Sequence, residues 1–121
     1  MIYKNPLKRI FHAAIYSING LIFALTHEQA FRYEFCVLVM IFALVIIFAV
    51  ELVWAVIFVA AWLIVMCFEL VNSAVEKAFD LIDENFRAEI KAGKDMLSAA
   101  VFVVIFLNVI LWLIFVTQKL F

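Results

Sequence analysis

Long apolar runs separated by short polar breaks dominate the chain, and this pattern predicts membrane-spanning helices. Residues 35–50 carry no charge, and the run from Leu52 to Phe68 is apolar without interruption. A third apolar run extends from Met96 to about Thr117. Because a helix of roughly 20 apolar residues crosses the hydrocarbon core of a bilayer, we predict spanning helices at about 29–50, 52–85 and 96–117.

The first 27 residues follow a different pattern. Apolar residues recur at helical spacing from Ile10 to Leu25, whereas Lys8 and Arg9 lie mostly off that stripe. This arrangement predicts an amphipathic helix over residues 1–27 that lies in the membrane surface. Further along the chain, residues 83–94 form a polar connection. Asp95, which follows it, is the expected N-cap of the last helix.

Composition supports the same fold class. Of the 121 residues, 70% are hydrophobic and 16% are charged, whereas a soluble domain is roughly 45–50% apolar. We therefore predict a single domain of the all-α integral membrane class. Cys36 and Cys67 lie inside apolar runs, which predicts buried thiols and neither a disulfide nor a metal site.

Basic residues predict the orientation of the chain. All but one of the clearly placed lysines and arginines fall on the side of the N-terminus and of the 83–95 connection, and Lys119 alone falls on the other. The positive-inside rule then places the N-terminus in the cytoplasm and the C-terminus outside. A helix over 52–85 would be roughly 50 Å long, so its last turns extend into the cytoplasm. Three spanning helices enclose little volume, which predicts a homo-oligomer.

A polar stripe crosses the predicted membrane boundary of the second spanning helix. Glu69, Asn72, Glu76 and Asp80 are spaced three, four and four residues apart, which puts them on one helical face. Glu69 falls just inside the apolar layer and Glu76 just outside it. An ionisable residue flanked by apolar ones in a spanning helix favours a functional role.

These residue types fit phosphoryl transfer to a lipid. Mg²⁺ prefers one or two carboxylates together with phosphate oxygens, so Glu28 and Glu76 can share the metal of a metal nucleotide. Glu69 lies at the depth of a lipid hydroxyl and can act as its general base. Two simpler interpretations stay open, a solvated helix end for Glu76 and a helix–helix hydrogen bond for Asn72.

Four segments in order resemble the prokaryotic diacylglycerol kinase family. The most specific is E-L-V-N-S-A-V-E-K-A-F-D at 69–80, which matches the signature E-x-x-N-[ST]-A-[IV]-E-x-x-x-D. The others are A-A-I-Y-S-I-N-G-L at 13–21, H-E-Q-A-F-R-Y-E at 27–34 and A-G-K-D-M-L-S-A-A-V at 92–101. The resemblance covers nearly the whole chain.

The resemblance implies a homotrimer in the bacterial inner membrane, with a surface helix and three membrane helices per subunit and active sites shared between neighbours. It implies transfer of the γ-phosphoryl of ATP, with Mg²⁺, to a lipid hydroxyl, and no nucleic-acid partner. Glu69 matches the catalytic base, and Glu28 and Glu76 match the metal ligands. The nucleotide-binding positions are Arg9, Tyr16, Glu28, Glu76, Lys94 and Asp95. The lipid-binding positions are Ala13, Ala30, Phe31, Arg32, Glu34, Glu69, Asn72 and Ser98.

A departure at residues 86–87 and three rival functions complete the prediction. Phe86 and Arg87 stand where the family often has a Tyr-His pair that helps hold the nucleotide, and Arg87 can take over that contact. Diacylglycerol is the expected acceptor, with undecaprenol kinase as the nearest alternative. A small proton-coupled transporter that uses Glu69 is a more distant alternative, because such transporters usually have four spans and many helix glycines. A membrane scaffold without activity is the third alternative.

Overall fold

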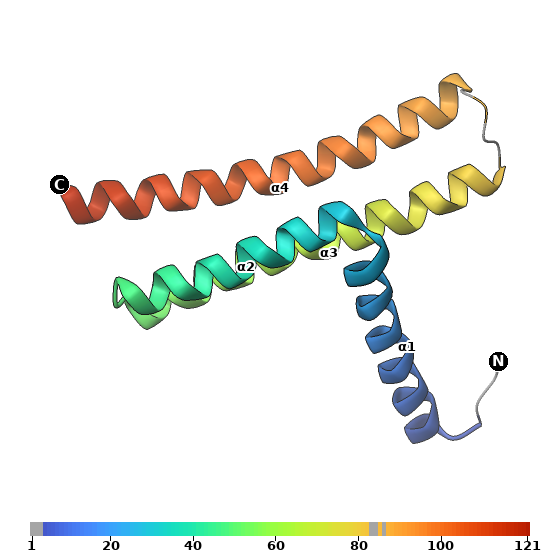
Figure 1. The fold of residues 1–121 in the computed structure, drawn as a ribbon, viewed down its shortest axis with the longest axis horizontal. Helices are drawn as coiled ribbons and strands as arrows, with labels where there is room; N and C mark the ends of the chain where they lie inside the picture. Colours follow the sequence, from blue (N-terminus) through green and yellow to red (C-terminus); the bar gives the residue numbers. More distant parts are fainter. Residues whose placement is uncertain (1–3, 83–84, 86) are drawn as a thin grey trace.

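The structure is a computed structural model that describes residues 4–82, 85 and 87–121. These residues form four helices: α1 (Pro6–His27), α2 (Gln29–Ile47), α3 (Leu52–Ile82) and α4 (Ala88–Leu120) (Figure 1). The all-helical prediction is therefore confirmed. Each of the four is long and apolar enough to cross a membrane. That includes α1, so its location in the membrane surface stays a prediction.

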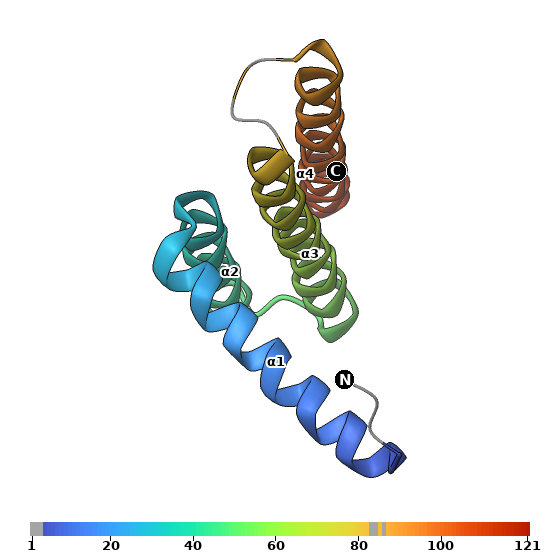
Figure 2. The ribbon, with the colours of Figure 1, turned by 90° about the vertical axis from the view of Figure 1, so that its right-hand side faces the viewer.

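The N-terminal helix meets the rest of the chain at a sharp elbow. Asn5 starts α1 by accepting a hydrogen bond from the backbone N–H of Leu7 at 3.0 Å, and Pro6 follows it in the first turn, where the missing N–H of proline costs nothing. At the other end, Glu28 is extended and is at once the C-cap of α1 and the N-cap of α2. Figures 1 and 2 show that α1 therefore runs across the direction of the other three helices.

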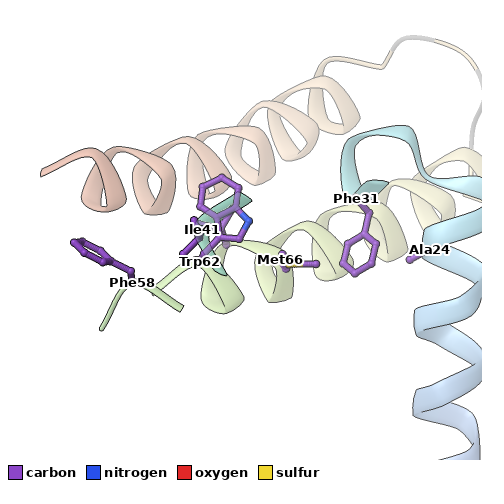
Figure 3. Packing of buried hydrophobic residues seen from close by; sticks show 7 residues of the cluster. Ala24, Phe31, Ile41, Phe58, Trp62 and Met66 are labelled. Atoms are coloured by element: carbon purple, nitrogen blue, oxygen red, sulfur yellow. The ribbon is translucent and has the colours of Figure 1, made fainter. Parts of the chain in front are cut away.

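The three remaining helices lie side by side with α3 between α2 and α4 (Figure 2). The buried apolar cluster holds α1, α2 and α3 together (Figure 3), and its members are Ala24, Phe31, Ile41, Phe58, Trp62, Val65 and Met66. Between α3 and α4, the rings of Phe58 and Trp112 stack with their centroids 3.8 Å apart. Asn108 of α4 donates a hydrogen bond to the carbonyl oxygen of Ala61 at 3.2 Å, a contact between helices of the kind that polar side chains make in membranes.

The start of α4 differs from the prediction. The helix begins at Ala88, with Arg87 as its N-cap, instead of at Met96 after Asp95. Asp95 lies inside the helix, where it accepts a hydrogen bond from Lys91 at 2.6 Å one turn earlier. Gly93 does not stop the helix, because it packs against α3: a Cβ at this position would lie 2.7 Å from the ring of Phe79.

Two other predicted boundaries also shift. α2 ends at Ile47, and the chain then turns through Ala49, which has a φ of 47°, in the left-handed region that few non-glycine residues adopt. α3 ends at Ile82 instead of at Asn85. Asp83, Glu84 and Phe86 lie outside the described residues.

The prediction of buried thiols was wrong. Cys36 and Cys67 are both free and exposed on the outer faces of α2 and α3. A spanning helix can be apolar all round because lipid, or another subunit, covers the faces that the chain itself leaves open. An apolar neighbourhood in sequence therefore does not identify the buried face.

Candidate functional site

The site is built around Glu69, which lies in α3 with only 7% of its surface exposed. Ser73 follows one turn later and is 9% exposed. Between them, Asn72 holds a buried side-chain oxygen, Oδ1, that has no hydrogen-bond partner. The helical repeat therefore gathers a carboxylate, an amide and a hydroxyl on one face, as the sequence predicted for Glu69 and Asn72.

Three further carboxylates surround Glu69. Glu28, Glu34 and Glu76 are all near enough to interact with it electrostatically. Glu28 comes from the elbow between α1 and α2, Glu34 from α2 and Glu76 from α3. Glu34 is 8% exposed, and Trp62 of α3 donates a hydrogen bond from its indole Nε1 to the Glu34 carbonyl oxygen at 2.8 Å. That bond ties the Glu34 segment of α2 to α3.

Two lysines flank these acids on the same side. Lys77 forms an ion pair with Glu28, and its ammonium lies 5.5 Å from the centre of the Phe23 ring. Lys94 pairs with Asp80 at 2.8 Å and also interacts with Glu76. Lys94 donates the hydrogen bond to Asp80, and a lysine is a cation at neutral pH.

The other predicted site residues are not brought to this cluster within one chain. Arg9, Ala13 and Tyr16 are exposed on the N-terminal part of α1, which extends away from the other helices (Figure 1). Ala30 and Ser98 are exposed as well. A single chain therefore assembles the acidic part of the predicted site and leaves most of the remaining positions on its outer faces.

Three predicted residues have contacts of their own. Arg32 donates a hydrogen bond to the Thr26 carbonyl oxygen at 2.8 Å across the elbow. Asp95 is held by Lys91. Phe31 is 2% exposed and belongs to the apolar core, so in this chain its side chain has no free surface that could contact a ligand.

A cavity of about 490 Å³ lies between α1 and α3 beside the acidic cluster. Its wall is mostly apolar, with Leu21, Ala24 and Leu70 among the residues that form it. Four polar side chains also line it, namely Ser17, Glu28, Ser73 and Lys77. A cavity with an apolar wall and a few polar groups has the character that a lipid with a polar head requires.

The acidic residues fit a magnesium ion that arrives with a nucleotide. Within residues 4–82, 85 and 87–121, no group of three or more His, Cys, Asp or Glu is arranged to hold a metal ion unaided. Mg²⁺ is usually bound by one or two carboxylates and completes its shell with substrate phosphates and water. Glu28 and Glu76 provide two carboxylates next to Glu69. The unpartnered Oδ1 of Asn72 is a further oxygen nearby that can act as a metal ligand.

Comparison with known proteins identifies the family. The profile of the family described as "Prokaryotic diacylglycerol kinase" matches residues 15–116, which is most of the chain. The chain belongs to the prokaryotic diacylglycerol kinase family. It is accordingly a membrane protein and a lipid kinase.

Relatives named as diacylglycerol kinases align with most of this sequence. The diacylglycerol kinase of Escherichia coli K12 is 34% identical over 106 residues, which cover 88% of this chain and 87% of the relative. That of Helicobacter pylori 26695 is 34% identical over 110 residues, covering 87% and 82%. That of Pseudomonas aeruginosa PAO1 is 32% identical over 109 residues, covering 90% and 89%.

Two residues of the site had no predicted role in it. Neither Lys77 nor Ser73 was among the predicted catalytic, metal-binding, nucleotide-binding or lipid-binding positions. Ser73 has a signal in the sequence, since it lies four residues after Glu69 and thus on the same helical face. Lys77 has none, because its pairing with Glu28 depends on the elbow that folds the end of α1 toward α3.

Proposed function

We propose that this kinase transfers the γ-phosphoryl group of MgATP to the hydroxyl of diacylglycerol and so produces phosphatidic acid. The observation that carries the proposal is the buried Glu69 of α3, which lies among three other carboxylates and next to a cavity with a largely apolar wall. A carboxylate in this place is costly in a spanning helix unless the chemistry uses it. The relatives named as diacylglycerol kinases support this choice of acceptor.

In this proposal Glu69 is the general base. The oxygen of the lipid hydroxyl attacks the γ-phosphorus while its proton passes to the Glu69 carboxylate. A new oxygen–phosphorus bond forms, the bond from the γ-phosphorus to the bridging oxygen breaks, and ADP leaves. Phosphoryl transfer of this kind depends mainly on positioning and on charge stabilisation. Asn72 and Ser73, on the same face of α3, orient the hydroxyl toward Glu69.

Glu28 and Glu76 would hold the magnesium ion. When bound, the ion neutralises charge that develops on the phosphate oxygens. Lys94 already lies near Glu76 as a cation, and it binds phosphate, while Asp95 completes this side of the nucleotide site. Arg87 is the remaining candidate for a nucleotide contact at the start of α4.

The remaining positions require a neighbouring subunit. Arg9, Tyr16 and Ala13 lie on the part of α1 that extends away from its own bundle (Figure 1), so α1 can reach another subunit along the membrane surface. We therefore include in the proposal a homotrimer in the inner membrane, with the N-terminus in the cytoplasm and the C-terminus outside. Ala30, Arg32, Glu34 and Ser98 then border the lipid, and Phe31 supports that wall from the core.

An assay with two acceptors tests the proposal. Purified protein in mixed micelles receives ATP labelled in the γ-position and either diacylglycerol or undecaprenol, with Glu69→Gln as the inactive control. We expect labelled phosphatidic acid to form faster than labelled undecaprenyl phosphate. Faster labelling of the polyprenol would assign the chain to undecaprenol kinases. If neither lipid stimulates ATP consumption, that result would contradict the catalytic role and favour a scaffold or a transporter.

A further inference from the structure

The chain itself places a cation, the ammonium of Lys77, beside a proposed metal ligand. Lys77 lies one residue after Glu76 on α3, and its ammonium is paired with Oε1 of Glu28 at the elbow between α1 and α2. The Glu28 side chain keeps only 21% of its surface exposed, whereas that of Lys77 keeps 53%. The pair thus bridges two parts of the chain that are far apart in sequence, and it does so at a proposed metal ligand.

The position of Lys77 has a consequence for metal binding. Lys77 holds an oxygen of the carboxylate that the proposed function assigns to Mg²⁺, and a second cation entering there must either replace the ammonium or lie beside it. Both alternatives cost free energy, the first because an ion pair is lost and the second because like charges repel. The acidic cluster is therefore partly neutralised before any metal arrives.

The ammonium also has a second support. It lies 5.5 Å from the centre of the Phe23 ring, within the range in which an aromatic face attracts a cation. When the ion pair with Glu28 opens, this ring remains as a partner on the same side of the cavity that Phe23, Glu28 and Lys77 line together. Lys77 can therefore release Glu28 without leaving the site.

From this geometry we infer that Lys77 is a resident counter-cation of Glu28 that competes with the metal ion. This inference rests on the proposed function, because it takes Glu28 as a metal ligand. Lys77 is here a positioning residue: it acts on the metal through Glu28 and takes no part in the transfer itself. Its effect is to weaken binding of the metal alone.

The test measures Mn²⁺, a paramagnetic substitute for Mg²⁺, binding to the purified full chain without nucleotide or lipid, by electron paramagnetic resonance. Lys77→Met should bind Mn²⁺ about 1.4- to fivefold more tightly than the wild type, since a partly exposed ion pair is worth roughly 0.2–1 kcal/mol. Lys77→Arg keeps the charge and should restore the wild-type affinity. Lys77→Gln provides a second neutral variant if Lys77→Met does not assemble.

Lys119 offers a matched control at the other end of the chain. It also pairs with a glutamate, Glu51 at 3.0 Å, and also lies over a phenylalanine ring, that of Phe115 at 5.9 Å. Lys119→Met removes the same charge from the same kind of pair, and it should leave Mn²⁺ affinity unchanged. In a Glu28→Gln background, Lys77→Met should no longer have an effect.

Each outcome has a separate meaning. Unchanged or weaker Mn²⁺ binding by both neutral Lys77 variants overturns the competition, even where lipid phosphorylation is intact and the proposed function stands. An equal gain in Lys119→Met would show a general effect of net charge and would also overturn it. If Glu28→Gln binds Mn²⁺ as well as the wild type, the metal-ligand assignment itself is wrong.

Discussion

Replacement of Glu69 by Gln isolates the proposed base with little change in shape. The side chain is 7% exposed, and its neighbours on the same helical face are Asn72 and Ser73. Glutamine has the same length and can still form hydrogen bonds with these two residues, but it is neutral and cannot accept the hydroxyl proton. A neutral amide is also less costly to bury than a carboxylate, so we expect the variant to fold and to assemble.

The size of the effect follows from the role. General-base catalysis contributes about 10²- to 10⁴-fold, which corresponds to about 3–5 kcal/mol in the activation free energy at 1.36 kcal/mol per tenfold change. The loss should appear in kcat. Nucleotide affinity should change little, because the metal and phosphate contacts are assigned to Glu28, Glu76 and Lys94 instead.

The assay is formation of labelled phosphatidic acid in mixed micelles at saturating ATP and lipid, together with direct measurement of nucleotide binding. Glu51→Gln is the control, since it makes the same chemical change in an exposed carboxylate that pairs with Lys119, away from the site. A Glu69→Gln variant that retains a third or more of the wild-type kcat would refute the general-base role. A variant that loses nucleotide binding to the same extent as kcat would show that Glu69 holds the nucleotide instead.

Four further variants test other parts of the interpretation. Glu76→Gln should raise the Mg²⁺ concentration needed for half-maximal nucleotide binding, and an unchanged Mg²⁺ dependence would remove Glu76 from the ligand set. Cys36→Ala and Cys67→Ala should each keep near-normal activity, since both thiols are free and exposed; loss of activity in a folded variant would show a role that the structure does not explain. Asn108→Leu removes the hydrogen bond to Ala61 and should lower unfolding stability in detergent by about 0.6 kcal/mol, up to about 1.7; a stability equal to the wild type would mean that this buried hydrogen bond contributes nothing measurable.

Helical periodicity accounts for the parts of the fold and site that the sequence predicted correctly. The apolar runs place α2, α3 and most of α4. The three- and four-residue spacing puts Glu69 and Asn72 on one face of α3, and the structure agrees. Both predictions use contacts within one helix, and such contacts depend on residues only a few positions apart.

Features that depend on contacts between helices were not predictable in the same way. The predicted start of α4 at Met96 was too late, because the helix extends back to Ala88 and Gly93 lets α4 pass close to Phe79 of α3. The pairing of Lys77 with Glu28 requires the elbow after His27. The exposure of Cys36 on α2 depends on which face meets α3, and a helix that is apolar all round gives no periodic signal for that face.

The buried polar atoms of the site give a chemical reason for its ligands. In the part of the chain that the structure describes, Oε2 of Glu34 and Oδ1 of Asn72 are buried without a hydrogen-bond partner. Both are hydrogen-bond acceptors. Glu34 lies on α2, and Asn72 lies on α3, the helix that carries Glu69. Buried acceptors of this kind are expensive to leave unpaired, so whatever satisfies them must bring hydrogen-bond donors or a cation. A lipid hydroxyl and a magnesium nucleotide bring both, which is why the same oxygens that cost stability in the isolated chain favour a kinase over a scaffold.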